Sequence, residues 1–405
     1  MDEGYLPLDA SYATRAIHEC QDPEKWSSRA VVPPITMSAN FQLDTSGDIE
    51  KGYFYSRFGN PTRDVLEKCL ASLDDAKYGL CYSSGLCAVA AVVNLLRAGE
   101  HVVCASDVYG GTYYNLAELA TERGVEVSFY DISKEKGLAD SIRPNTKLVL
   151  IESPSNPLGR LVDIRAASAE CKKHPGVILA IDNTFQTSYF QKTLAMGVDV
   201  VMYSLTKYMN GHSDVIMGAV VTSNDEIYKR LHKQQIYLGI MPSPFDCFLV
   251  SRGIKTLAVR LKQHMRNGIH VAKYLQKHPK RNKPVEPCLS DHPQHELLKT
   301  QSSGICGIFA FYIKNAGLEE VKKFIASTKV FVNAGSVGAV ESLITSPAIV
   351  SHFAVPREER LAIGITDNLI RLSVGIEDAE ELCKDLDQAL WAALNESVNT
   401  KVTTD

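Results

Sequence analysis

The sequence predicts an α/β fold in which a large, mostly parallel sheet is followed by a smaller α/β domain. Between residues 78 and 204, short apolar runs alternate with helix-like stretches. The runs lack the strict apolar–polar alternation of a half-solvated sheet, and strands buried on both faces, each followed by a helix, are typical of a parallel sheet. After residue 239 a long helical region is followed by further strand-like and helix-like runs at a different spacing, which indicates a second domain.

The chain starts with an irregular segment and a well-marked first helix. Residues 1–60 contain Pro33-Pro34 and few periodic runs, so we interpret them as an arm that packs against another surface. At Asn60-Pro61 a capping residue precedes a proline in the first-turn position, which predicts the start of a helix. Apolar residues then follow one helical face as far as Leu73.

The later elements follow from the same patterns. Strands are predicted at 78–82, 101–105, 125–130, 147–152, 177–181 and 200–204, with helices at 85–96 and 164–172 among the segments between them. The smaller domain should contain a helical region at 242–277, strands at 308–312 and 369–374, and helices at 317–327 and 378–394. We therefore expect an arm at 1–60, a large domain at 61–250 and a smaller C-terminal domain at 251–405.

Composition disfavours several classes of protein. The 43 basic and 47 acidic residues give a net charge of −4, which argues against a polyanionic partner such as nucleic acid. No run of about 18 uncharged apolar residues exists, and the acidic start at Met1–Gly4 does not resemble a secretory signal, so no membrane association is expected. The ten cysteines stand singly without a CxxC pair, which predicts reduced thiols and a cytoplasmic location.

Three groups of residues follow predicted strands, where functional groups of parallel sheets gather. Ser83-Ser84-Gly85-Leu86 joins a strand to a helix and is either an anion site or a tight turn. Asp182 ends a buried strand and either meets a cation or caps the next turn. Lys207 follows the strand at 200–204 and is either a surface lysine or one that forms a Schiff base with a carbonyl cofactor.

Together these groups fit pyridoxal 5′-phosphate (PLP). This cofactor needs a lysine for its aldehyde, an anion for its ring nitrogen and an anion site for its phosphate. Tyr109, in the loop after another predicted strand, either lies over the cofactor ring or is a packed loop aromatic.

Motifs along nearly the whole chain carry a family resemblance. They include Tyr55-Ser56-Arg57, Asn60-Pro61-Thr62, Ser84-Gly85-Leu86, Asp107 through Thr112, Asn156-Pro157, Asp182-Asn183-Thr184, Ser204 through Asp214, His292 through Leu297, and Arg371 through Gly375. With these motifs in this order, the chain resembles the Cys/Met-metabolism family of PLP-dependent enzymes. The resemblance implies the fold-type I architecture and an obligate homodimer that pairs into a homotetramer.

The resemblance also implies a role for each matching residue. Lys207 would form the Schiff base, Asp182 would pair with the pyridine nitrogen, and Tyr109 would stack on the ring. Residues expected to hold the phosphate are Gly85, Leu86, Ser204 and Thr206, with Tyr55 and Arg57 reaching the phosphate of the neighbouring subunit. Those expected to hold the substrate's α-carboxylate are Asn156, Ser336 and Arg371, because an arginine fork grips a carboxylate at two points.

The implied reaction is cleavage of a carbon–sulfur bond by γ-elimination of L-cystathionine to L-cysteine, 2-oxobutanoate and ammonia, with hydrogen sulfide from cysteine or homocysteine as a side product. Three substrate-lining positions depart from the family pattern: Phe54, Tyr114 and Gly335 replace the usual glutamate, arginine and glutamate. Alternatives are therefore γ-elimination of methionine, γ-replacement by a thiol, or a catalytically weak paralogue that binds the cofactor.

No metal site is expected. His292, His295 and Glu296 lie close together in the sequence, but Pro293 disfavours a helical face that presents both rings, and no third ligand set is evident.

Overall fold

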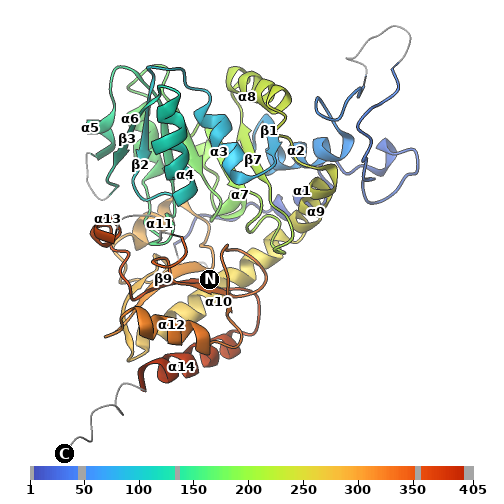
Figure 1. The fold of residues 1–405 in the computed structure, drawn as a ribbon. Coiled ribbons are helices and arrows are strands. Elements are labelled where there is room, and N and C mark those ends of the chain that lie inside the picture. The colour runs from blue at the N-terminus through green and yellow to red at the C-terminus, as the bar shows by residue number, and fades with distance from the viewer. Residues whose placement is uncertain (1–3, 44–51, 133–136, 352–356, 396–405) are drawn as a thin grey trace, which may run out of the picture. The chain divides into compact units, whose positions relative to one another are not determined.

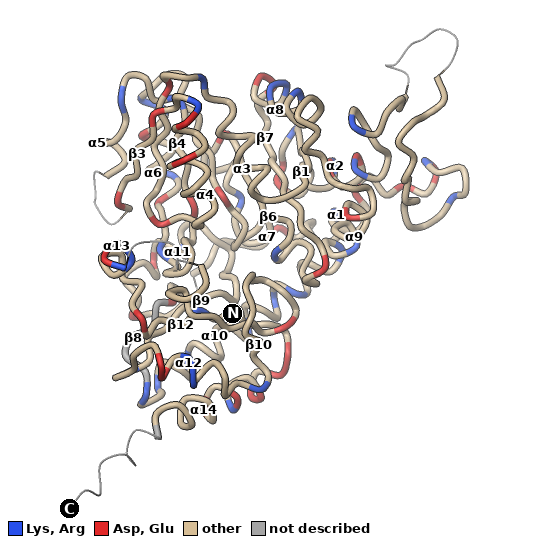
Figure 2. Tube along the Cα trace, viewed as in Figure 1, with Lys and Arg blue, Asp and Glu red and all other residues tan. Residues whose placement is uncertain are grey.

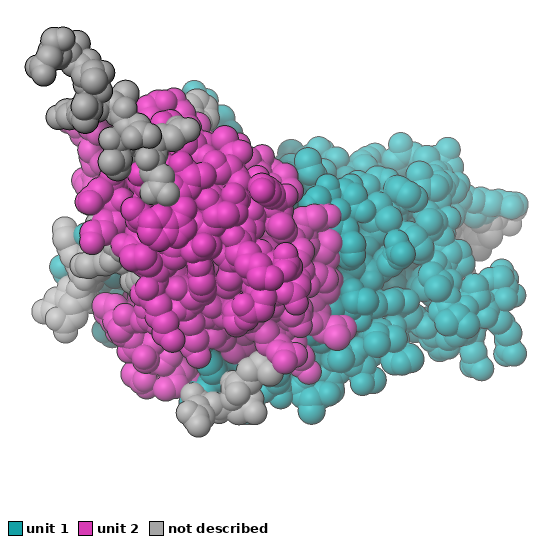
Figure 3. Space-filling model, turned by 90° about the horizontal axis from the view of Figure 1, so that it is seen from below, with its two compact units in different colours: residues 1–153, 162–258, 301–303 teal, residues 154–161, 259–300, 304–405 magenta. Residues whose placement is uncertain are grey.

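The computed structural model describes residues 4–43, 52–132, 137–351 and 357–395. Two compact units are present (Figure 3). Unit 1 comprises residues 1–153, 162–258 and 301–303, and unit 2 comprises residues 154–161, 259–300 and 304–405. The predicted limits at residues 60 and 250 stay predictions.

Unit 1 contains a seven-stranded sheet in the order β1-β7-β6-β5-β4-β2-β3 (Figure 1). Its strands are β1 (Tyr78–Tyr82), β2 (His101–Ala105), β3 (Glu126–Tyr130), β4 (Thr146–Glu152), β5 (Ile178–Asp182), β6 (Val200–Ser204) and β7 (Gly218–Thr222). Every residue of β2 is buried, as expected for a sheet covered on both faces. The six predicted strands are confirmed within a residue or so at each end.

The strand β7 was not predicted. It is antiparallel to both β1 and β6, whereas the pairs from β6 to β3 are parallel. No helix separates β6 from β7, so the strand–helix alternation that identified the other strands gives no signal for β7. The sheet is nevertheless mostly parallel, as predicted.

Helices pack along this sheet, and the first of them begins as the sequence predicts. Asn60 caps α2 (Pro61–Leu73) through side-chain hydrogen bonds from the N–H groups of Thr62 at 2.9 Å and Arg63 at 3.3 Å. The other helical segments of unit 1 are α3 (Gly85–Val93), α4 (Gly110–Tyr114), η3 (Asn115–Ala120), α5 (Gly137–Ser141), α6 (Ile164–Cys171), α7 (Thr187–Phe190), η4 (Leu194–Met196), α8 (Asp225–Tyr237) and α9 (Pro244–Ile254).

The arm is less irregular than predicted. It contains α1 (Tyr12–His18), which packs against α2, and a short 3₁₀ turn, η1 (Pro23–Lys25). Tyr12 and Ala16, four residues apart, are buried on one face of α1. A seven-residue helix offers only this one apolar pair, too short a pattern to be recognised in the sequence.

Unit 2 contains a five-stranded mixed sheet in the order β10-β11-β12-β9-β8. Its strands are β8 (Arg281–Val285), β9 (Ile308–Ile313), β10 (Val332–Asn333), β11 (Leu343–Thr345) and β12 (Leu369–Ser373). Its helices are α10 (Leu257–Lys277, which begins in unit 1), α11 (His295–Gln301), α12 (Leu318–Ser327), α13 (Arg357–Ala362) and α14 (Ala379–Asn395). Residues of α10, α12 and α14, among them Val271, Phe324 and Leu386, form one core with the sheet.

Charge is spread along the chain of both units, where basic and acidic residues are interspersed (Figure 2). None of the helices among the described residues has the length and apolarity that crossing a membrane requires.

Candidate active site

Four strands of unit 1 end at the same edge of the sheet. The register pairs Glu152 of β4 with Asp182 of β5, and β6 ends beside them at Ser204. The antiparallel strand β7 pairs its Gly218 with Ser204 on one side and with Tyr82 of β1 on the other. The edge therefore brings together the three groups that the sequence places after separate strands.

The loop after β1 forms a cradle at the start of α3. The Ser84 hydroxyl accepts a hydrogen bond from Cys87 N–H at 3.0 Å, and α3 begins at Gly85. A Cβ on Gly85 would lie 3.0 Å from the Cβ of Ser204, so a larger residue would push the loop away from β6. The first N–H groups of a helix have no partner within the helix and attract anions. This cradle, with half-exposed Leu86 beside it, suits a phosphate group.

The loop after β6 is tied to β7 by Thr206. The Thr206 hydroxyl accepts a hydrogen bond from Met217 N–H at 3.0 Å and lies 3.2 Å from the Met217 carbonyl oxygen, to which it donates. This hydroxyl fixes the turn that carries Lys207. The predicted contact between Thr206 and a phosphate stays a prediction.

Asp182 and Lys207 form the charged pair at this edge. The Asp182 carboxylate accepts a hydrogen bond from Thr184 N–H at 3.0 Å. Burial raises the pKa of Asp182, while the Thr184 hydrogen bond and the positive charge of Lys207 act to lower it. The half-buried Lys207 follows β6 in a turn where its N–H donates to Ser204 O at 3.2 Å. An anionic group in a poorly solvated position suits a cationic ring nitrogen.

Tyr109 lies in the loop between β2 and α4, and the residue is 45% exposed. Its N–H donates to the Glu152 carboxylate at 2.8 Å, and a Cβ on Gly111 would lie 2.6 Å from the Tyr109 ring. Glu152, which is 6% exposed, was missed in the sequence. A carboxylate at the end of the predicted strand at 147–152 was the signal that could have identified it.

These features match the parts of PLP. The helix start at Gly85 suits its phosphate, Asp182 suits its ring nitrogen, and the exposed ring of Tyr109 offers a face for stacking. The residues present therefore fit this cofactor, and the individual contacts predicted for them stay predictions.

Unit 2 brings together the three residues expected to hold a carboxylate. Arg371 of β12 is 6% exposed, and its guanidinium donates to the Asn156 side-chain oxygen at 3.1 Å and to Ser336 O at 3.0 Å. Neither acceptor carries a negative charge. Ser336 has a φ of 87°, a conformation that non-glycine residues rarely adopt and that clusters at functional sites.

The predicted arm residues lie next to one another in unit 1. Tyr55 is 39% exposed, and the Arg57 guanidinium lies 5.3 Å from the Tyr55 ring and 4.9 Å from the Phe58 ring. Arg57 also donates to Ile236 O at 3.1 Å. Phe54 packs against Phe58 with ring centroids 4.6 Å apart.

The other two residues that depart from the family pattern, Tyr114 and Gly335, are exposed. Tyr114 ends α4 with 37% of its surface exposed, and its ring forms a T-shaped pair with the Tyr113 ring, the centroids being 5.8 Å apart. Gly335 precedes Ser336, and a Cβ there would meet no atom within 4 Å.

The two histidines do not form a cluster of metal ligands. The Nδ1 of His292 accepts a hydrogen bond from Gln294 N–H at 3.1 Å, whereas the Nδ1 of His295 lies 2.9 Å from Pro287 O. Across the described ranges, no group of three or more His, Cys, Asp or Glu side chains could hold a metal ion.

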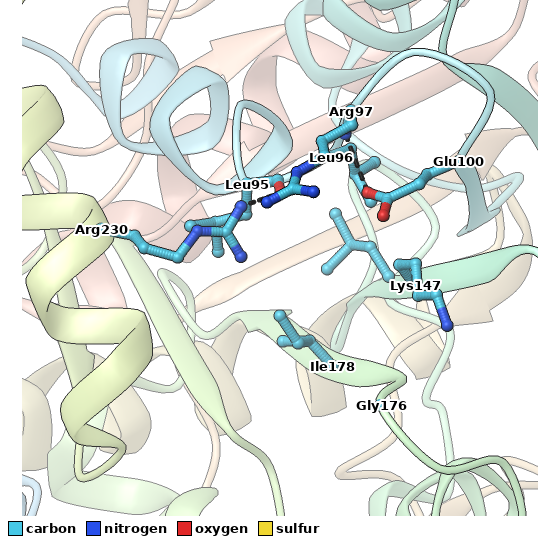
Figure 4. Close-up of a pocket in the computed structure, with 9 residues that line it drawn as sticks. Leu95, Leu96, Arg97, Glu100, Lys147, Gly176, Ile178 and Arg230 are labelled. Carbon is cyan, nitrogen blue, oxygen red and sulfur yellow. Dashed lines mark hydrogen bonds between the residues drawn. The ribbon is translucent and has the colours of Figure 1, made fainter.

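A cavity of about 160 Å³ lies at the opposite edge of the same sheet, near the first residues of β4 and β5. Arg97, Glu100, Lys147 and Arg230 are among its lining residues (Figure 4). None of the site residues predicted from the sequence lines this cavity, so the candidate site stays at the carboxyl edge.

Comparisons with known proteins agree with this chemistry. A relative from Bos taurus, "Cystathionine gamma-lyase", is 49% identical over 390 residues, which is 96% of this chain and 96% of the relative. The protein of the same name from Mus musculus is 50% identical over 96% of this chain and 98% of its own length.

Solved structures give the same result for the fold. A cystathionine gamma synthase from Xanthomonas oryzae pv. oryzae superposes with a TM-score of 0.91 at 40% identity, covering 95% of this chain and 99% of that chain. A cystathionine gamma-lyase from Lactobacillus plantarum superposes with a TM-score of 0.90 at 35% identity, covering 94% and 99%. The family model "Cys/Met metabolism PLP-dependent enzyme" matches residues 13–391. The chain therefore belongs to the Cys/Met-metabolism family of PLP-dependent enzymes and has its fold-type I architecture.

Proposed function

We propose that this protein is a PLP-dependent carbon–sulfur lyase that cleaves L-cystathionine by γ-elimination. The products are L-cysteine, 2-oxobutanoate and ammonia, with water consumed. The observation that carries the proposal is the identity of about one half, over 96% of the chain, to relatives that bear the name of this activity. In a cell the reaction would complete transsulfuration to cysteine.

The residues of the two units have separate tasks in this proposal. When bound, PLP supplies a ring that accepts the negative charge developing at the substrate carbon. Asp182 keeps the ring nitrogen protonated. Lys207 removes the α-proton and then, aided by Tyr109, moves a β-proton, so that the γ-thiolate leaves as cysteine. Arg371 holds the α-carboxylate through its guanidinium fork.

The first test is product identification. Purified, PLP-loaded protein is incubated with L-cystathionine, and the oxo acid is identified by mass spectrometry. We expect 2-oxobutanoate with cysteine. Pyruvate with homocysteine would mean β-elimination and would overturn the proposal. A protein that binds PLP but releases no oxo acid from any sulfur amino acid would be a catalytically weak paralogue.

Two of the three departures from the family pattern, Phe54 and Gly335, favour methionine as a second candidate substrate. Phe54 packs against another phenylalanine, and Gly335 offers no side chain, so neither position supplies a carboxylate for the distal ammonium of cystathionine. The ratio of kcat/KM for cystathionine to that for methionine separates the candidates. Incubation with an activated homoserine and cysteine tests γ-replacement in the same preparation.

We also propose a homotetramer in which Tyr55 and Arg57 reach the phosphate of a neighbouring subunit. The exposure of Tyr55 and the position of both residues in the arm support this. Two inactive variants, Arg57→Ala and Lys207→Ala, should regain part of the activity when they are unfolded and refolded together, because one mixed site then carries neither change. No recovery, in mixtures shown to contain mixed oligomers, would contradict shared sites.

The cytoplasmic location remains part of the proposal. All ten cysteines are free thiols in the structure, in keeping with a reducing compartment. Fluorescence microscopy of the tagged chain in its own cell would test it.

A further inference from the structure

A buried carboxylate behind the candidate site has no role in the chemistry described so far. Asp74 is the capping residue that directly follows α2, and it is 3% exposed. A negative charge is unfavourable at a helix C-terminus and costly when buried. Burial accordingly raises the pKa of Asp74 to about 7. An acidic residue in such an expensive position needs a compensating interaction.

The Asp74 carboxylate is hydrogen-bonded to Tyr203. The Tyr203 hydroxyl donates to the Asp74 carboxylate at 2.7 Å and is itself 3.4 Å from the side-chain nitrogen of Asn183, which donates to it. Tyr203 is 1% exposed and Asn183 is fully buried. The hydrogen bonds thus run in one direction, from Asn183 through Tyr203 to Asp74. Asn183 is the residue next to Asp182.

The neighbouring cations, Lys192 and Arg15, form hydrogen bonds with the C-terminal end of α2. Lys192 donates to Leu73 O at 2.5 Å and to Asp75 at 3.0 Å. Arg15 donates to Ser72 O and to Asp75. These hydrogen bonds satisfy the carbonyl oxygens of Ser72 and Leu73. The positive charges of Lys192 and Arg15 also act to lower the pKa of Asp74, whose carboxylate accepts its hydrogen bond from Tyr203.

The turn after β5 is held from both sides of the sheet. Asn183 N–H donates to Met202 O at 3.0 Å, and Thr184 accepts a hydrogen bond from Ser204 N–H at 2.8 Å. Successive strand residues face opposite sides, so Tyr203 lies on the face away from Ser204 and from Asp182, whose register partner is Met202. The Asn183 side chain reaches that same face, because it donates to the Tyr203 hydroxyl. The Asn183 side chain, which also donates to Gln191 O at 3.0 Å, anchors the turn on that far face.

We infer that Asp74 is a positioning residue. It acts through Tyr203 and Asn183 to fix the turn after β5, and this turn holds Asp182 where it can pair with the ring nitrogen of the cofactor. The inference rests on the role proposed for Asp182. It does not depend on which sulfur amino acid is the substrate.

The test compares two buried tyrosines. Tyr203→Phe removes the hydroxyl that joins Asn183 to Asp74. Tyr12→Phe is the matched control, because Tyr12 is also fully buried and its hydroxyl lies 2.9 Å from Ser188 Oγ, outside this chain of hydrogen bonds. Cofactor affinity is measured by titrating each apoenzyme with PLP, and the pH dependence of the bound-cofactor absorption band is recorded alongside thermal unfolding.

We expect Tyr203→Phe to weaken PLP binding about tenfold, the size of one or two hydrogen bonds, and to shift the absorption titration. Tyr12→Phe should lower the unfolding temperature but leave PLP affinity within about twofold. Asp74→Asn, which keeps an acceptor oxygen for Tyr203, should retain most of the affinity lost in Asp74→Leu. Equal PLP affinity in Tyr203→Phe and wild type would overturn the inference.

A double variant separates this inference from the proposed function. If Tyr203 acts through Asp182, adding Tyr203→Phe to Asp182→Ala costs no further PLP affinity. An additive loss would show that Tyr203 acts independently of Asp182 and would overturn the inference, even with full lyase activity. An inactive protein that still binds PLP and shows the non-additive result would overturn only the reaction. A wild type that binds no PLP overturns both.

Discussion

The carboxyl edge of the unit 1 sheet and the middle of β12 in unit 2 present charged groups in different ways. In unit 1, Asp182 and Lys207 stand at or just after strand ends, where adjacent parallel strands place several groups side by side. In unit 2, Arg371 lies inside an antiparallel strand, and its guanidinium is fixed by two neutral oxygens. The first arrangement places several charged groups where they can bind one cofactor, whereas the second holds a single guanidinium in a fixed orientation. Variants at the carboxyl edge should therefore change PLP affinity and kcat, whereas variants of Arg371 should change KM for the substrate.

The largest effect is expected for Lys207→Ala. Without the amine that moves protons, release of 2-oxobutanoate from cystathionine should fall by at least ~10³-fold. Lys172→Ala, a change to an exposed lysine at the end of α6, should match wild type in the same coupled assay. Activity in Lys207→Ala within tenfold of wild type would remove Lys207 from the proposed chemistry.

Asp182→Ala should act on both cofactor affinity and rate. Loss of the carboxylate leaves the ring nitrogen without its counter-charge, so we expect PLP affinity and kcat each to fall about 10²-fold. Absorbance titration of the apoenzyme measures the first and steady-state kinetics the second. Asp182→Glu, which keeps the charge, should lose less of both. A variant with unchanged PLP affinity would break the contrast between the two units.

Arg371→Leu should weaken binding of the substrate without weakening binding of PLP. Removing the guanidinium should raise KM for cystathionine by about 10- to 100-fold, with PLP affinity unchanged. Arg371→Lys keeps the charge but loses the fork, so its KM should lie between those of Arg371→Leu and wild type. Weakened PLP binding in Arg371→Lys, together with a normal KM, would contradict the assignment of cofactor binding to the unit 1 edge and of substrate binding to Arg371.

The smallest effect is expected for Phe54→Glu. A carboxylate at this half-buried position should raise kcat/KM for cystathionine relative to methionine about fivefold, at the low end for a contact with an ammonium group. Phe54→Leu serves as the control for the loss of ring packing. An identical ratio in both variants would place Phe54 away from the distal end of the substrate.

The sequence predicted the groups that follow strongly apolar strands and missed those that depend on pairing across the fold. Asp182 and Lys207 were found because each closely follows a recognisable strand. Glu152 also ends a predicted strand, but its partner, the N–H of Tyr109, is 43 residues away in the chain, so its role appears only once β4 and the Tyr109 loop are placed. The contact of Arg371 with Asn156 spans 215 residues of chain, and no local pattern reports such a contact; those residues were named only through the family resemblance.

The strand β7 also constrains when the cofactor site is completed during synthesis. The two sides of the cradle, at Ser84 and Ser204, are separated by about 120 residues, and Gly218 lies between them in the sheet. A side chain on Gly218 would overlap the carbonyl oxygen of Ser84. A nascent chain in which β7 has not yet emerged from the ribosome therefore lacks the strand that lies between the two sides. The complete cradle for the phosphate can therefore form only after residue 222 of 405 has been made.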